Sequence, residues 1–228
     1  MDGVLWHDNE PIGDLPDIFT AINRMALKVI FVTNNASKNI KEIQSKLASF
    51  GVNVPEEQIV TSALATLRFI ARNYPPKSRV YVVGTSSLRD QFRAHGYTVL
   101  EDTNPTNAHI VSVSIDPEIN YQKLANASLL IRDGAQFIAT NTDTTYPTPQ
   151  GLLPGAGTFV AAVAAASGKD PLVIGKPQPT VFLQAMEIMG TQPRETLCVG
   201  DRLETDVLGG QNRSEERRVG KECRSRWS

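Results

Sequence analysis

The chain has 228 residues, of which 41% are hydrophobic and 21% charged, and its formal net charge is −1. This length accommodates one large domain or two small ones, and the near-neutral charge excludes a global field that attracts nucleic acid or a membrane surface. No apolar run reaches the roughly 18 residues of a membrane span. The N-terminus lacks the pattern of a secretory signal and two cysteines make no disulfide framework, so we expect a cytoplasmic protein.

Apolar, β-branched runs alternate with helical patterns from Lys28 to Gln211, which is typical of βα units around a parallel sheet. The first run is nearly continuous in apolar residues, as expected of a strand buried on both faces. In chain order the patterns predict a strand at 28–33, a helix at 39–50 that ends at Gly51, and a helix that begins after Ser62 and stops before Pro75.

A smaller α/β unit follows the Pro75-Pro76 pair, which marks a domain boundary. The unit closes with a loop at 142–154, rich in Thr, Pro and Gly, and an alanine-rich helix at 157–167. Its other elements are strands predicted at 79–84, 109–115 and 136–141, and helices predicted at 86–95 and 121–132.

Gly168-Lys169-Asp170 marks a second boundary. After it the patterns predict a strand at 171–175, a helix at 179–189 and a strand at 196–200, which holds Cys198 as inert core. The fold class is therefore α/β, with a Rossmann-like parallel-sheet core interrupted by a large α/β insert. We assign residues 1–75 and 170–212 to the core and residues 76–169 to the insert.

Residues 213–228 break the pattern of everything before them, with few apolar residues and neither helical nor strand periodicity. A solvated basic tail or a weak nucleic-acid arm is one interpretation. The string also looks like the translation of a sequencing-adapter oligonucleotide joined in frame to a truncated gene. We therefore exclude this segment, with Cys223 and Trp227, from the fold as an artefact.

Four short polar segments share one placement, each just after a predicted strand, where open parallel sheets bind their ligands. Singly, each has an ordinary explanation: Asp-Gly is a turn, Thr-Asn-Asn a helix cap, a Lys before Pro a solvated charge. Together they bring an acid, a hydroxyl with backbone amides, a cation and two carboxylates to one point, which suits a phosphate beside a divalent metal. The segments are residues 1–6, 31–35, 173–177 and 198–201, with Asp206 behind the last.

These segments resemble the four motifs of the haloacid dehalogenase superfamily, in the branch of 4-nitrophenylphosphatase, phosphoglycolate phosphatase and NagD-like enzymes. The resemblance rests on Asp-Gly-Val-Leu-Trp, Thr-Asn-Asn-Ala-Ser-Lys, Gly-Lys-Pro and Gly-Asp-Arg-Leu-Glu-Thr-Asp, with the Pro- and Gly-rich run at 146–157. It covers roughly residues 1–212. It implies an Mg²⁺-dependent phosphatase of small phosphate monoesters, and it implies that the insert is a cap domain.

The first family motif is Asp-x-Asp-Gly, in which the first Asp is the nucleophile. Asp2-Gly3 match its second half, so the nucleophile would lie one residue before Met1. We therefore expect a fragment, incomplete at both ends and inactive as written. Asp2 would be the general acid and base, and its backbone carbonyl would ligate Mg²⁺.

The resemblance also assigns the other motif residues. Thr33 and the amide of Asn34 would bind phosphoryl oxygens, with Asn35 shaping that loop. Lys176 would neutralise charge on the phosphate. Asp201 would bind Mg²⁺, with Asp206 holding the metal site from close by. These assignments suit a carboxylate attacking a phosphate dianion, since that repulsion calls for cations.

Asp143 and Tyr146 lie in the loop that a cap of this family points at the active site, so they would select the substrate. A plain surface loop is the alternative. The substrate itself stays open beyond a small phosphate ester. So does the oligomeric state, with a homo-oligomer formed through the cap as one option.

Two other functions remain in competition at this point. A catalytically dead module could still bind phosphate and Mg²⁺ without its nucleophile. A dinucleotide-binding oxidoreductase is disfavoured, because residues 151–157 are glycine-rich without the fingerprint order. The three histidines are scattered without an i,i+4 pair, which disfavours a zinc site.

Overall fold

The computed structural model describes residues 1–148 and 150–211. The predicted artefactual tail, with Cys223 and Trp227, lies outside these residues. Among the helices described, none combines the length and the apolar character that crossing a bilayer would require.

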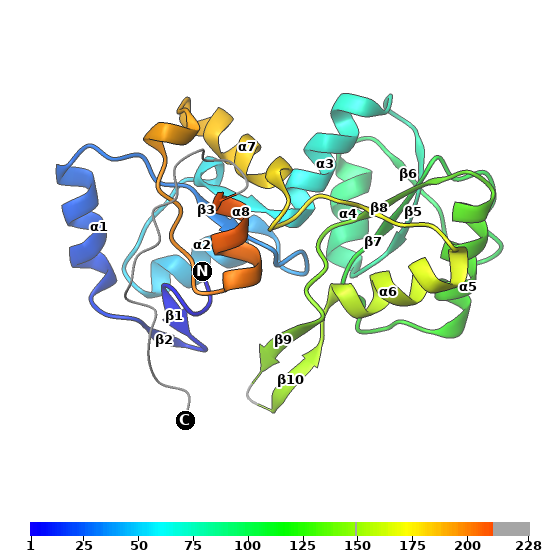
Figure 1. Ribbon diagram of the computed structural model, residues 1–228, viewed down its shortest axis with the longest axis horizontal. Coiled ribbons are helices and arrows are strands. Elements are labelled where there is room, and N and C mark those ends of the chain that lie inside the picture. The colour runs from blue at the N-terminus through cyan, green and yellow to red at the C-terminus, as the bar shows by residue number, and fades with distance from the viewer. Residues whose placement is uncertain (149, 212–228) are drawn as a thin grey trace.

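The protein is an α/β protein whose largest sheet has five parallel strands in the order β11-β8-β7-β5-β6 (Figure 1). Three of the strands confirm the strands predicted for the insert, each with shorter ends. The sheet consists of β5 (Arg79–Val83), β6 (Thr98–Val99), β7 (Ile110–Val113), β8 (Gln136–Ala139) and β11 (Leu172–Val173).

Both faces of this sheet are buried, because successive side chains of a strand point to opposite faces. Val80 and Val82 of β5 pack on one face in a cluster with α3 (Ser62–Asn73) and α4 (Ser86–Ala94). Tyr81 and Val83 pack on the other face in a second cluster, which also takes residues from α5 (Tyr121–Arg132) and α6 (Ala156–Ser167). Thr85 and Asn120 cap α4 and α5 by accepting backbone N–H bonds at their N-termini.

The rest of the described chain is built from shorter elements. β3 (Phe31–Thr33) pairs in parallel with β4 (Ile59–Thr61) and forms a separate two-stranded sheet. The elements around it are β1 (Trp6–His7) and β2 (Glu10–Pro11), which form a hairpin, α1 (Leu15–Arg24), α2 (Ile40–Ser49), the 3-10 turns Glu56–Gln58 and Pro193–Glu195, α7 (Pro179–Met189), the π-helical turn Leu203–Val207 and α8 (Leu208–Gln211).

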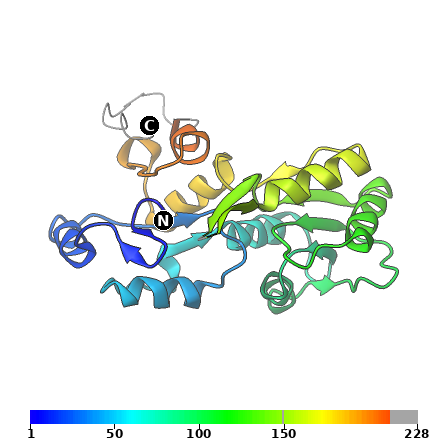
Figure 2. The same ribbon diagram turned by 90° about the horizontal axis from the view of Figure 1, so that it is seen from below.

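Figures 1 and 2 show how these parts share the long axis of the molecule. The insert occupies one end, α1 and α2 lie toward the other, and α3 and α7 pack together between them. α3 connects the two parts, since its Ala63, Leu67 and Ile70 belong to the same buried cluster as β5 and β7.

The strand predicted at 196–200 is wrong. The segment has no regular structure, and Leu197 and Val199 are 85% and 71% exposed. A strand needs a hydrogen-bonded neighbour, and within the described residues none pairs with this segment. The prediction of Cys198 as core is wrong for the same reason, because the side chain is exposed.

Two further predictions change in detail. The strand predicted at 171–175 forms only at Leu172–Val173, where it pairs with β8 of the insert rather than with a core strand. The predicted loop at 142–154 contains an antiparallel hairpin, β9 (Thr145–Thr148) with β10 (Gly151–Pro154), which projects from the body in Figure 1. The division into core and insert stays a prediction.

Candidate active site

The loop after β3 is buried and held by its own side chains. Thr33 and Asn34 are 6% and 8% exposed. Thr33 Oγ1 accepts a bond from the Asn35 backbone N–H at 3.1 Å. Asn35 Oδ1 in turn accepts bonds from Ser37 N, Ser37 Oγ and Lys38 N at 2.9, 2.9 and 3.2 Å. The Asn35 side chain therefore shapes the turn.

The Asn34 side chain joins this loop to the segment that carries Lys176. Its Oδ1 accepts from the Lys176 backbone N–H at 2.8 Å, and its Nδ2 donates to the Lys176 carbonyl at 3.0 Å. A Cβ on Gly175 would lie 2.7 Å from Asn34 Oδ1 and 2.5 Å from the Thr140 carbonyl. Glycine at 175 is therefore required for this close approach.

The ammonium group of Lys176 forms a buried ion pair with Asp206. Lys176 Nζ and Asp206 Oδ1 are 2.5 Å apart, and each side chain is 9% exposed. Asp206 Oδ2 also accepts from the Arg202 backbone N–H at 3.3 Å. An isolated buried charge is strongly destabilising, so removal of either side chain would leave the other as an uncompensated buried charge. The π-helical turn Leu203–Val207 brings Asp206 to this position.

Asp2 is turned toward the β1–β2 hairpin. Its Oδ1 accepts a hydrogen bond from Trp6 Nε1 at 2.6 Å. Trp6 is 3% exposed, and Lys46 Nζ lies 4.8 Å from the centre of its ring. Lys46 Nζ also donates to the Asp8 carbonyl at 2.6 Å, which ties the hairpin to α2. An indole N–H fixes the orientation of the carboxylate predicted to be the general acid.

Asp201 is exposed, and its carboxylate fills the space where Gly3 would carry a Cβ. Gly3 also has φ +74°, so both space and backbone call for glycine there.

The three carboxylates predicted to serve the metal have different partners. Asp206 pairs with Lys176, Asp2 with Trp6, and Asp201 lies beside Gly3. Within residues 1–148 and 150–211, no group of three or more His, Cys, Asp or Glu side chains stands ready to hold a metal ion. A closed cage of protein ligands is therefore not formed by these residues.

The structure brings Asp143 into the site. Asp143 follows β8, and its Oδ2 accepts from Asn34 Nδ2 at 3.1 Å. Its Oδ1 lies 3.9 Å from Arg202 Nη1, so the loop of the insert also faces the segment after Asp201. Tyr146 lies farther along, half-buried on β9 opposite Leu153.

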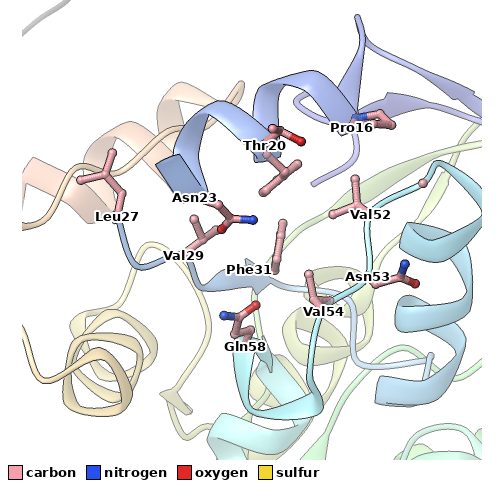
Figure 3. Close-up of a pocket in the computed structure, with 12 residues that line it drawn as sticks. Pro16, Thr20, Asn23, Leu27, Val29, Phe31, Val52, Asn53, Val54 and Gln58 are labelled. Carbon is pink, nitrogen blue, oxygen red and sulfur yellow. The ribbon is translucent and has the colours of Figure 1, made fainter. Parts of the chain in front are cut away.

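Two cavities lie beside β3, and they are lined by different residues. One of about 50 Å³ is lined by Met1, Asp2, Thr33 and Asn35 together with side chains of β1 and α2. Another of about 190 Å³ lies between α1, β3 and residues 51–58, where Figure 3 shows Thr20 and Asn23 across from Val52 and Asn53. None of the predicted site residues lines the larger cavity, so we place the site at the smaller one.

Sequence reasoning missed Trp6, Lys46 and Asn141 as parts of the site. Asn141 Nδ2 donates to the Asn34 carbonyl at 2.9 Å, and Asn141 Oδ1 accepts from the Asp143 N–H at 3.0 Å. A signal was present for Asn141, because it follows the end of β8 by two residues, just as Asn35 follows the end of β3. The indole of Trp6 and the ammonium of Lys46 are joined only by tertiary packing, so spacing alone carried no signal for them.

Comparison with known proteins gives matches to family models and to curated relatives. Residues 1–98 match the model of the haloacid dehalogenase-like hydrolases, and residues 173–213 match a second model described as HAD-hydrolase-like. The 5'-nucleotidase YutF of Bacillus subtilis is 38% identical over 212 residues, 93% of this chain and 81% of that protein. An acid sugar phosphatase of Staphylococcus saprophyticus is 35% identical, over 93% of this chain and 80% of its own.

Solved structures give the same result. A p-nitrophenyl phosphatase from Archaeoglobus fulgidus superimposes with a TM-score of 0.86 at 30% identity, covering 93% of this chain and 80% of that one. A glycerol phosphate phosphatase from Mycobacterium tuberculosis, solved in complex with magnesium, superimposes with a TM-score of 0.82 at 34% identity. That match covers 93% of this chain and 63% of the other.

Proposed function

The chain belongs to the haloacid dehalogenase-like hydrolases, in their p-nitrophenyl phosphatase branch, and from this premise we propose that it hydrolyses small phosphate monoesters with Mg²⁺ through an aspartyl-phosphate intermediate. One observation carries the proposal. The turn after β3 and a buried lysine, 142 residues apart in sequence, are bonded through one side chain, Asn34.

The phosphoryl group would lie against Thr33 and Asn34. The Thr33 hydroxyl and the Asn34 backbone N–H would donate to its oxygens, and Lys176 would offset its charge. Such charge-assisted bonds are roughly twice as strong as neutral ones, and they act most strongly where water is excluded. The low exposure of Thr33, Asn34 and Lys176 supports this role.

The donor set fits Mg²⁺. This ion prefers one or two carboxylates with water and phosphate oxygens over a complete cage of protein ligands. Asp201, exposed beside Gly3, would be the direct carboxylate ligand, with the Asp2 carbonyl as a second and Asp206 behind. When bound, the ion supplies positive charge to the phosphate oxygens. The magnesium complex of the M. tuberculosis relative supports this choice of ion.

Asp2 would move the proton. It would protonate the leaving oxygen and later take a proton from the attacking water, with Trp6 fixing its direction. The covalent step would belong to the first Asp of the Asp-x-Asp-Gly motif, whose second half is matched by Asp2-Gly3. An aspartyl-phosphate divides one hard hydrolysis into two easier steps.

The substrate class follows from what the relatives share. Their names specify a nucleotidase, sugar phosphatases, p-nitrophenyl phosphatases and a glycerol phosphate phosphatase. The common chemistry is a small alcohol or phenol esterified to phosphate. Asp143 and Tyr146, in the loop and hairpin after β8, would contact the part that differs between substrates.

A second candidate is a module that binds phosphate and Mg²⁺ without turnover. It is favoured by one observation, that the phosphate-binding turn and the buried lysine are joined through Asn34 by contacts that need no nucleophile. A dinucleotide-binding oxidoreductase has no such support, since the family matched is one of hydrolases.

The two candidates are separated by one comparison. We expect the 228-residue chain to release no measurable phosphate from p-nitrophenyl phosphate, because loss of a covalent nucleophile removes several orders of magnitude in rate. The same chain with an Asp placed before Met1 should turn over when Mg²⁺ is present. Turnover by the 228-residue chain within tenfold of the extended one would contradict the aspartyl-phosphate route.

A further inference from the structure

The side chain of Asn34 is buried, and its carboxamide makes three hydrogen bonds that use both of its N–H hydrogens. Its two N–H hydrogens go to Asp143 Oδ2 at 3.1 Å and to the Lys176 carbonyl at 3.0 Å. Its oxygen accepts from the Lys176 N–H at 2.8 Å. An amide offers two donor hydrogens and one oxygen, so this side chain is committed to protein partners and would meet a phosphate only through its backbone.

The two hydrogen bonds from the Asn34 side chain engage both the backbone N–H and the backbone C=O of Lys176. An acceptor opposite the N–H and a donor opposite the C=O reproduce the pattern of a strand neighbour. The preceding residue is fixed as well, since the Gly175 N–H donates to the Thr140 carbonyl at 2.9 Å. The backbone of Lys176 is therefore positioned by Asn34, while its ammonium group is held by Asp206.

The insert holds Asn34 from two sides. The Asp143 carboxylate takes one side-chain hydrogen, and the Asn141 side chain donates to the Asn34 carbonyl at 2.9 Å. The loop at 141–143 is itself closed by the bond from the Asp143 N–H to Asn141 Oδ1. The loop at 141–143 is thus bonded to both the side chain and the backbone of Asn34.

From these contacts we propose that Asn34 is a positioning residue that couples the loop at 141–143 of the insert to Lys176. The place of the phosphate-neutralising cation then depends on the loop that would face the substrate, and the insert influences hydrolysis as well as binding. The functional role of Lys176 rests on the proposed function. The coupling itself rests only on the hydrogen bonds.

Exchanging donor and acceptor tests the coupling. Asn34→Asp keeps size and shape but removes both donors, so the Lys176 carbonyl loses its partner and two carboxylates meet at the Asp143 contact. Adding Asp143→Asn returns a donor to that contact and restores the original net charge. The matched control is Asn39→Asp, the same change at the N-cap of α2, where Asp caps as well as Asn does.

The first readout is amide exchange of Lys176 in the full 228-residue chain, followed by NMR. The Lys176 N–H keeps an oxygen acceptor in Asn34→Asp. The two carboxylates repel each other and the bond to the Lys176 carbonyl is lost, so residue 34 should move away from the Lys176 N–H and raise its exchange rate by about tenfold. The double variant should recover at least half of that change on a logarithmic scale, and Asn39→Asp should leave the rate unchanged. A double variant no better protected than Asn34→Asp would overturn the coupling.

The second readout is the affinity for inorganic phosphate with Mg²⁺, measured on the same proteins. It should fall by about tenfold with Asn34→Asp and recover in the double variant. If the unaltered chain binds no phosphate, the proposed function fails while the exchange data still decide the coupling. If Asn34→Asp does not fold, Asp143→Ala with Asn141→Ala must raise Lys176 exchange by about threefold; an unchanged rate would overturn the proposal.

Discussion

The insert and the rest of the chain are organised differently, although both are α/β. The insert supplies four of the five parallel strands of the largest sheet, which is covered on both faces, with Tyr81, Ile110 and Ile138 fully buried. The rest relies on the two-stranded pair β3–β4. Both parts leave some large apolar side chains exposed, such as Leu197 in the rest and Leu129 in the insert. The predicted catalytic groups lie mainly in the second part, and contacts from the first part brace them.

The contacts that carry this bracing are few and identifiable. α3 shares the buried cluster of β5 and β7, and the loop after β8 bonds to Asn34. Regions with few buried apolar contacts open at lower free energy than a packed core. We therefore expect the two parts to differ in stability as well as in chemistry.

The largest effect is expected at the predicted metal ligand. In the chain extended by an Asp before Met1, Asp201→Ala should abolish hydrolysis and the response to Mg²⁺ after EDTA treatment, since a carboxylate is the ligand that Mg²⁺ requires from the protein. Glu204→Gln, an exposed change on the following turn, is the control. Metal-dependent turnover by Asp201→Ala would show that another residue binds the ion.

A large difference is also expected under limited proteolysis. Residues 1–75 and 170–211 should be cut first, leaving a piece the size of the insert, because segments such as the one at 196–200 have no regular structure. Mass spectrometry of the surviving piece locates its ends. Digestion of both parts at the same rate would contradict the proposed difference in stability, and so would equal protection of the β3 and β5 amides from exchange.

An effect of intermediate size is expected when the same substitution, Leu→Ala, is made at Leu67 and at Leu197. Leu67 of α3 is fully buried in the shared cluster, whereas Leu197 is 85% exposed. Leu67→Ala should lower the free energy of unfolding by about 2–5 kcal/mol. Leu197→Ala should change it by less than about 0.5 kcal/mol. Urea denaturation measures both, and similar values for the two would contradict the role of α3 as the link.

The smallest effect concerns the insert alone. Burial raises the pKa of the Tyr81 hydroxyl, which donates to Asp102 Oδ1 at 2.9 Å. A raised folded-state pKa gives stability that is complete below about pH 10 and lost as the pH rises above it. Tyr81→Phe should cost about 1 kcal/mol at neutral pH and flatten the alkaline decline. Tyr121→Phe, at a side chain 86% exposed, should do neither.

The insert was more predictable from sequence than the rest. Its strands are apolar, β-branched and paired with sequence neighbours, so β5, β7, β8, α5 and α6 were expected within a few residues. The segment at 196–200 has the same apolar composition, yet no described strand pairs with it. An apolar, β-branched composition indicates that a segment can form a strand, but the strand forms only where a neighbouring strand pairs with it. The missed helix α1 had a signal in Asp14 as N-cap followed by Pro16.

The site was predicted one motif at a time, because each motif was expected just after a strand, although the strand expected before Asp201 does not form. The resemblance supplied Thr33, Lys176 and Asp206, and the structure joins Lys176 to Asp206 and to the turn after Thr33. What sequence could not supply was the bonding between motifs. Asn34 contacts Lys176 across 142 residues and Asp143 across 109, and no periodicity encodes such pairs.

The proposed aspartyl-phosphate is tested most directly by trapping it. The chain extended by an Asp before Met1 is mixed with p-nitrophenyl phosphate and Mg²⁺, quenched in acid during turnover, and analysed by mass spectrometry of its peptides. We predict one phosphoryl group on the added Asp, and none when Asn is placed there instead. Turnover without a phosphorylated protein, or a phosphoryl group on any other residue, would contradict the mechanism.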